Sequence, residues 1–239
     1  MKKENYKISA SYQRSTRLDT DLSSKIFNQL ILHDSYKDLL QKIINMSEQG
    51  GQHAFTLTGP YGGGKSTFAI LLAGLLSSNK KIRSSAENLL PKKILSNFKK
   101  SFNNDNGWVV VKVVSGGEDH IASLYDALVI AVNDFWGNQK KPKEIESLPK
   151  PKNFHQLIEY FELVAKEASS LKDKSGLIIV FDELGKVFEN AQKNNTDLYF
   201  FQELSERFNR SNNSCFFIGI LHQAFQEYAK NTTQSIRDE

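Results

Sequence analysis

The sequence predicts an α/β fold, a three-layer α/β/α sandwich built around a mainly parallel sheet. Four apolar runs, at 54–58, 108–114, 177–182 and 215–221, have the length and the β-branched or aromatic content of strands. Segments between them repeat apolar residues at helical spacing, and strands that alternate with helices form parallel sheets. At 239 residues the chain is long enough for one such domain with a full core.

A glycine-rich loop follows the first of these runs, in the stretch AFTLTGPYGGGKST at 54–67. It matches the pattern G-x-x-x-x-G-K-[ST] at every fixed position. Glycines let the backbone turn with positive φ and bring its N–H groups close to a polyphosphate. A helix that begins near Lys65 adds the positive end of its dipole at the same point. The pattern therefore predicts a nucleoside triphosphate site, for ATP.

Each part of this loop has an expected role. Lys65 would reach the β- and γ-phosphates, the Ser66 hydroxyl would ligate Mg²⁺, and Thr67 would lie within reach of the α-phosphate. The nucleotide is expected to contact the whole loop, namely Gly59, Pro60, Tyr61, Gly62, Gly63, Gly64, Lys65, Ser66 and Thr67. The alternative is a chance match in a glycine-rich turn. The strand-like run before the loop and the helical spacing after it argue against chance.

Two acids end the run LIIVFDE at 177–183. A central parallel strand would deliver them beside the phosphate loop, because the carboxyl ends of parallel strands share one edge. Asp182 is then expected to hold the Mg²⁺ hydration shell together with Ser66, and Glu183 to polarise the attacking water as general base. A solvated turn after a strand is the alternative for the two acids. The run at 215–221 ends at His222 and Gln223, which could contact the γ-phosphate or the lytic water, or serve as a cap or core hydrogen bond.

The other segments can be assigned in order. Residues 9–34 suggest a polar arm leading into a short helix, and apolar spacing predicts helices at about 36–46, 118–136, 154–171 and 197–208. Asp34 or Ser35 is expected to cap the first of these, and the glycines at 50–51 to end it. The segment 77–107 reads as a helical insertion whose lysines, Lys92, Lys93, Lys99 and Lys100, either face nucleic acid or form an ordinary solvated face. We divide the chain into an arm with helices at 1–49, packing on the core, and an ATPase core at 50–239.

Composition excludes several classes of protein. No apolar run approaches the length that spans a bilayer, and the basic N-terminus lacks the apolar stretch of a signal peptide, so we expect a cytoplasmic protein that does not bind membranes. The single cysteine, Cys215, lies in an apolar run and is expected to be a buried structural thiol. A net charge of +4 permits nucleic-acid contact without demonstrating it.

Taken with their spacing, these motifs resemble those of the AAA+ and related additional-strand P-loop ATPases. GPYGGGKS is similar to Walker A, LIIVFDE to Walker B, and the end of CFFIGILHQ to sensor 1. The resemblance implies catalytic roles for Lys65, Glu183, His222 and Gln223, and places Ser115 where a polar residue restrains the catalytic glutamate. More narrowly, RSTRLDTDL, FDELGK and LHQAF are similar to the N-terminal ATPase part of large bacterial ATPases in defence against phage.

The sequence also departs from that pattern. Such ATPases continue after the sensor strand into a fifth strand, an arginine finger and usually a helical lid, which these residues do not reach. We therefore expect a core that is incomplete at its C-terminus, that hydrolyses ATP weakly alone, and that relies on self-assembly or partner subunits for an arginine finger.

The leading expectation is Mg²⁺-dependent ATP hydrolysis that drives a conformational change in a larger assembly, with DNA or RNA as a candidate partner. The alternatives are a nucleotide-gated switch with little turnover and a phosphotransferase acting on a small acceptor. The second alternative needs an acceptor-binding arginine pair, and none lies near the motifs.

Overall fold

A parallel sheet forms the middle of the protein. The computed structural model describes residues 17–18, 20–60, 62–103, 105–114, 119–171, 175–194, 199–211 and 214–222. Within these residues the sheet has four strands in the order β1-β4-β3-β2, and every neighbouring pair is parallel. The strands are β1 (Ala54–Thr58), β2 (Val109–Val114), β3 (Leu177–Asp182) and β4 (Cys215–Leu221). Strand β4 therefore lies between the strand before the phosphate loop and the strand that ends in the acids.

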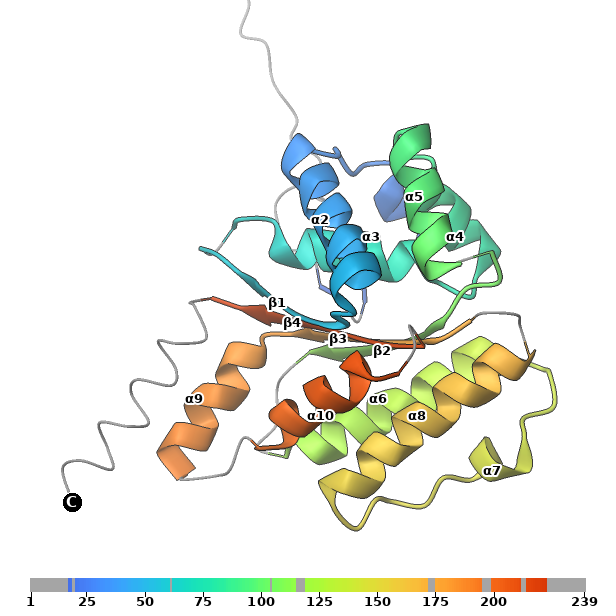
Figure 1. Cartoon of the computed structure of the whole chain (residues 1–239), viewed down its shortest axis with the longest axis vertical. Coiled ribbons are helices and arrows are strands. Elements are labelled where there is room, and N and C mark those ends of the chain that lie inside the picture. The colour runs from blue at the N-terminus through green and yellow to red at the C-terminus, as the bar shows by residue number, and fades with distance from the viewer. Residues whose placement is uncertain are drawn as a thin grey trace, which may run out of the picture.

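Helices cover both faces of this sheet, as Figure 1 shows. One layer contains α1 (Ser24–Phe27), α2 (Asp34–Gly50), α3 (Lys65–Leu75), α4 (Lys80–Glu87) and α5 (Lys92–Phe102). The opposite layer contains α6 (His120–Trp136), α7 (Lys143–Glu146), α8 (Phe154–Leu171), α9 (Leu184–Asn194) and α10 (Tyr199–Asn209). Each layer packs its own apolar cluster against the sheet. The three-layer α/β/α fold predicted from the sequence is confirmed.

The strands differ in how deeply they are buried. Every residue of β3 and β4 is buried, including the thiol of Cys215, whose pKa burial raises to about 12. Strand β2 has the nearly continuous valines that are typical of a strand buried on both faces, but its residues alternate between buried and half-buried. The reason is its place at an edge of the described sheet, where a strand has a neighbour on one side only.

Several helix boundaries differ from those expected. Helix α2 begins at Asp34 after His33, and neither Asp34 nor Ser35 caps it through a side chain. The lysine-rich insertion forms two helices, α4 and α5, because Pro91 and the residues before it interrupt the helical run. Helix α9 was not predicted at all. The expected helix at 197–208 is α10, which the structure describes from Tyr199 onward.

The described part of the N-terminal segment packs against the layer that contains α3. Leu18 and Phe27 are buried in the same cluster as α3. The ring of Phe27 lies directly over Gly74 in α3, where an added Cβ atom would come within 2.2 Å of the ring carbon Cζ. The Phe27 ring therefore packs against the backbone of α3 at a position where only glycine leaves room for it.

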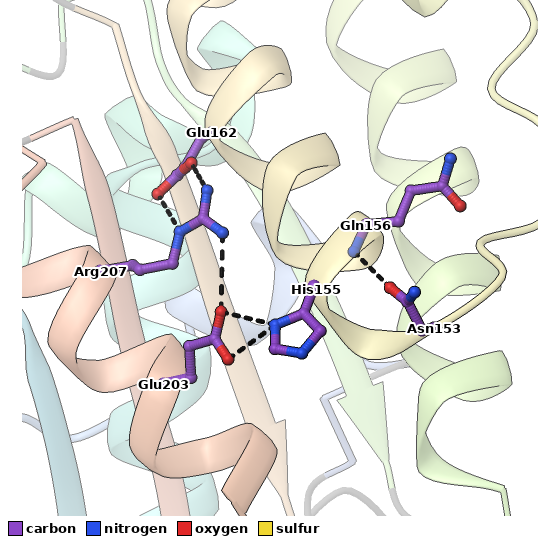
Figure 2. Close-up of polar contacts among 6 residues, drawn as sticks. All are labelled: Asn153, His155, Gln156, Glu162, Glu203 and Arg207. Atoms are coloured by element: carbon purple, nitrogen blue, oxygen red, sulfur yellow. Dashed lines mark hydrogen bonds and ion pairs between the residues drawn. The ribbon is translucent and has the colours of Figure 1, made fainter.

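A polar network fastens α10 to α8 on the other side of the sheet, as shown in Figure 2. Arg207 in α10 donates from Nε to Glu162 Oε1 at 2.9 Å and also pairs with Glu162 through a second nitrogen. Glu203, one turn earlier, lies 3.7 Å from Arg207 and 2.8 Å from His155 Nδ1. At the start of α8 the backbone N–H of Gln156 donates to Asn153. The network sets the position of the helix that leads into β4.

Candidate functional site

The phosphate loop connects β1 to α3 and leaves the first turn of that helix uncapped by any side chain. Gly64 precedes α3 as its N-cap residue, with φ of 78°, and offers no side-chain cap. A left-handed φ favours glycine, because a Cβ atom there is strained. The first N–H groups of α3 point out of the helix toward the loop, together with the positive end of its dipole. This arrangement is suited to binding an anion.

Lys65, the first residue of α3, folds back over the loop. Its Nζ atom donates to the carbonyl oxygens of Gly59 at 2.6 Å and Pro60 at 2.8 Å. Partial burial lowers the pKa of Lys65, and the nearby charge of Asp182 acts in the opposite direction. The ammonium group is thus held over the loop by weakly basic carbonyls that a phosphate oxygen could replace.

Ser66 and Asp182 meet across the end of the sheet. Asp182 ends β3 and is 6% exposed, and the Ser66 side chain hydrogen-bonds to it. Its Oδ1 atom also accepts the backbone N–H of Glu183 at 2.9 Å. Burial raises the pKa of Asp182, while these two hydrogen bonds lower it in part. The structure therefore brings together the hydroxyl and the carboxylate that the sequence assigns to Mg²⁺, and their role as Mg²⁺ ligands stays a prediction.

These two oxygen donors fit a magnesium ion. Mg²⁺ prefers oxygen ligands, keeps several waters and takes only one or two side chains besides substrate phosphates. In the part of the chain that the structure describes, no group of three or more His, Cys, Asp and Glu residues could hold a metal ion. A hydroxyl and one carboxylate beside a phosphate loop suit a metal that the nucleotide brings with it.

Glu183 occupies a strained position directly after β3. Its φ is 58°, which is unusual for a residue with a side chain and costs about 1 kcal/mol. Besides burial, the charge of Glu183 raises the pKa of Asp182, and α9 begins at the residue after Glu183, Leu184. Lys186, in the first turn of α9, donates from Nζ to Glu183 Oε2 at 2.7 Å. A backbone outlier of this kind is typical of functional sites.

His222 follows β4 and belongs to the same group of charges. Burial lowers its pKa first of all, and the positive charge of Lys65 lowers it further. Glu183 and Asp182 act in the opposite direction. His222 therefore lies close enough to Lys65, Asp182 and Glu183 for their charges to affect its pKa.

Other expected site residues can be placed only in part. Thr67 lies in the first turn of α3, as expected. Tyr61, Ser115 and Gln223 lie outside the described residues, so their expected roles stay predictions.

Tyr36 is a contact to the loop that the sequence did not suggest. Its hydroxyl donates to the carbonyl oxygen of Gly64 at 3.2 Å, and its ring packs against Phe68. A Cβ atom on Gly64 would lie 1.9 Å from the Tyr36 hydroxyl oxygen. The apolar spacing of α2 suggested only that Tyr36 faces the core. Nothing in the sequence connects this residue with a loop that begins more than 20 residues later.

Fold and site together define a P-loop NTPase domain, which binds nucleotide. A strand, a phosphate loop and a helix are followed by a strand that ends in acids, with β4 inserted between the two strands. The model of the KAP family P-loop domain matches residues 33–195, about two thirds of the chain, and the chain belongs to this family. Neither the curated proteins nor the solved structures give a match. Among the described residues, no helix is both long and apolar enough to span a bilayer.

Proposed function

We propose that the protein hydrolyses ATP with Mg²⁺ and that hydrolysis drives a conformational change within a larger assembly. The observation that supports this most directly is the hydrogen-bonded pair of Ser66 and Asp182 beside Lys65. These residues supply the hydroxyl, carboxylate and ammonium groups that phosphoryl transfer requires from a P-loop site.

Binding begins with the loop and the first turn of α3. The uncapped N–H groups donate to the β-phosphate, and Lys65 exchanges its two carbonyl partners for the β- and γ-phosphate oxygens. Ser66 and Asp182 would hold Mg²⁺, which would supply positive charge against the charge that develops on the phosphates. Tyr36 keeps the Gly64 carbonyl in place while the loop closes around the phosphates.

Glu183 acts on the attacking water. Its carboxylate orients the water in line with the γ-phosphate and accepts a proton from it as the new bond to phosphorus forms. The bond from the γ-phosphorus to the β–γ bridging oxygen breaks at the same time, and ADP is the leaving group. The Glu183 carboxylate also has Lys186 as a partner, whose Nζ atom donates to Glu183 Oε2 at 2.7 Å. His222 contributes a polar group near the γ-phosphate.

The assembly is proposed because two of the described arginines already have other partners. Arg83 is buried and donates to the carbonyl oxygens of Ser77 and Asp105 at 2.6 Å each. Arg207 is engaged by Glu162 and Glu203 on the opposite layer. An arginine finger can raise phosphoryl-transfer rates by about 10³-fold or more. We propose that a second copy or a partner subunit supplies it.

The test is Glu183→Gln in the full chain, with Glu144→Gln in α7 as a control that loses the same charge. We expect Glu183→Gln to reduce phosphate release by about 100-fold or more while ATP still binds. The control should release phosphate at the wild-type rate. If Glu183→Gln releases phosphate as fast as the wild type, Glu183 is not the general base and the proposed mechanism is wrong.

A nucleotide-gated switch with little turnover is the second candidate function. The ion pair between Lys186 and Glu183 favours it, because an ammonium on the carboxylate competes with the water for the same oxygen. A wild-type protein that binds ATP with Mg²⁺ but releases no phosphate, alone or with added partner, would support the switch. A role in defence against phage remains a prediction from short sequence segments.

A further inference from the structure

The segment that contains helices α4 and α5 has a larger net positive charge than the chain as a whole. Between Lys80 and Phe102 there are seven basic side chains and one acidic side chain, a formal charge of +6. The whole chain carries +4, so the remaining residues together carry −2. Figure 1 shows the two helices together at one side of their layer. The positive charge is therefore concentrated on one part of the surface.

The exposed positions of these helices hold only lysine and serine. In α4 they are Lys80, Lys81 and Ser84, and in α5 they are Lys92, Lys93, Ser96 and Lys100. We call these seven residues the basic surface. Apolar side chains of α5, such as Phe98 and Phe102, point into the core.

The acids near this surface are already paired with a different lysine. Lys99 lies 3.3 Å from Glu87 and 3.2 Å from Asp105, so both carboxylates are engaged by this one lysine. Within the described residues, none of the five lysines of the basic surface forms an ion pair. Their charges are available to a partner.

The geometry of α5 suits a regular row of phosphates. Lys92, Ser96 and Lys100 recur every four residues and so share one face of the helix, with Lys93 beside them. Lys92 and Lys100 are separated by about 12 Å along the helix axis. Lysine and serine are side chains that commonly contact phosphate oxygens, and such contacts bind without reading sequence.

We propose that the basic surface binds the phosphate backbone of duplex DNA. Its exposed positions lack aromatic side chains, on which unpaired bases would stack. They also lack apolar side chains, which a membrane-binding helix inserts into the lipid. The exposed face of α5, whose other sides pack on α2 and the core, can lie along the phosphates that border the wide major groove of B-form DNA. The major groove of duplex RNA, by contrast, is narrow.

This surface is separate from the nucleotide site. The phosphate loop lies at the start of α3, and α4 follows the other end of that helix after a short connection. The two sites use different residues, so the two proposals can fail independently.

The experiment is a fluorescence-anisotropy titration of a labelled 20-base-pair DNA duplex with the full chain at two salt concentrations. Five phosphate contacts predict a loss of affinity of about 500-fold between about 50 and 200 mM salt. The test variant is Lys92→Gln, Lys93→Gln and Lys100→Gln combined. We expect it to bind at least about tenfold more weakly at low salt, with the salt slope reduced by about 3.

A matched control removes three exposed lysines from the opposite layer, as Lys140→Gln, Lys150→Gln and Lys152→Gln combined. It loses the same charge and should bind DNA within about twofold of the wild type. Both variants should keep the wild-type melting temperature and phosphate-release rate, which excludes misfolding as the cause.

Three results would overturn the proposal. The first is a wild-type protein that does not bind the duplex at low salt. The second is an equal loss of affinity in the test and control variants. The third is tighter binding, through the same three lysines, to a single strand, to duplex RNA, or to vesicles of phosphatidylcholine with about 30% phosphatidylserine.

Discussion

The Nζ atom of Lys186 lies 2.7 Å from Oε2 of Glu183, so a cation in α9 holds the carboxylate that we propose as general base. The two residues are three apart, and the pair is partly exposed to solvent. The ammonium group occupies a carboxylate oxygen that the attacking water would otherwise contact.

Lys186→Met should therefore increase the basal rate of hydrolysis. An exposed ion pair is worth at most about 1 kcal/mol, which corresponds to a rise in kcat of about fivefold or less. KM for ATP should not change. Steady-state phosphate release measures both quantities, with Lys186→Arg expected to keep the wild-type rate and Lys166→Met in α8 as a control. If kcat instead falls in Lys186→Met and stays at the wild-type value in Lys186→Arg, then Lys186 positions Glu183 for the reaction.

Tyr36→Phe should weaken nucleotide binding without affecting the chemical step. The substitution removes the hydrogen bond to the Gly64 carbonyl, worth about 1 kcal/mol, so Kd for a non-hydrolysable ATP analogue should rise about fivefold or less. Calorimetric titration measures this change. Tyr125→Phe is the matched control, because that hydroxyl also donates to a carbonyl, of Leu148, but on the opposite layer. Equal weakening by both variants would contradict a role of Tyr36 at the loop.

Asp182→Asn should stabilise the fold while it removes Mg²⁺-dependent hydrolysis. Burial raises the pKa of Asp182, so the folded protein binds this proton more tightly than the unfolded chain does. The favourable contribution is complete below the ordinary pKa of about 4 and is lost as pH rises through the raised pKa. At neutral pH the ionised group is unfavourable, although solvent screens part of the effect. An amide still accepts the Glu183 N–H, so we expect Tm to rise by about 2 °C.

Calorimetry at two pH values checks the sign of this effect. The difference in Tm between Asp182→Asn and the wild type should be larger at about pH 7.5 than at about pH 4.5, where more of the wild-type carboxyl group is protonated. A lower Tm for the variant at the higher pH would mean that the charged form of Asp182 is stabilised by its partners more than burial destabilises it.

Gly74→Ala should destabilise the protein although alanine is the better helix former by about 1 kcal/mol. Its Cβ atom would lie 2.2 Å from Phe27 Cζ, and such overpacking costs about 1–3 kcal/mol. Urea unfolding measures the change in free energy. Gly50→Ala is the control, since its Cβ atom would meet nothing within 4 Å. Phe27→Leu combined with Gly74→Ala should recover part of the loss; no recovery would mean that Phe27 is not the cause.

Elements with a strong local signal could be predicted from the sequence. The strand at 215–221 and the helix at 154–171 have the expected boundaries, because each combines an uninterrupted apolar pattern with clear breaks at its ends. That Asp182 lies beside the phosphate loop was also predictable, since a parallel sheet places both motifs at one edge, whereas its role as a Mg²⁺ ligand stays a prediction.

Features that depend on tertiary neighbours could not be predicted. Strand β2 is as rich in valine as a central strand, and only the strand order makes it an edge strand in the described sheet. Helix α9 was missed because its apolar residues, Leu184, Val187 and Phe188, are confined to its first half. The contact of Tyr36 with Gly64 depends on how α2 lies against α3. The contact of Lys186 with Glu183 depends on the left-handed turn at Glu183. Residue spacing reveals neither arrangement.

The position of α3 has a mechanical consequence. The helix begins at the phosphate loop, and α4, which carries part of the basic surface, follows its other end after a short connection. Helix α3 is 11 residues long, about 16 Å, and packs against α4 beyond its far end. Used as a lever, it would move that end by about 3 Å for a tilt of about 10° at the loop. A change in the number of phosphates held by Lys65 could in this way alter the spacing of charges on α4 and α5.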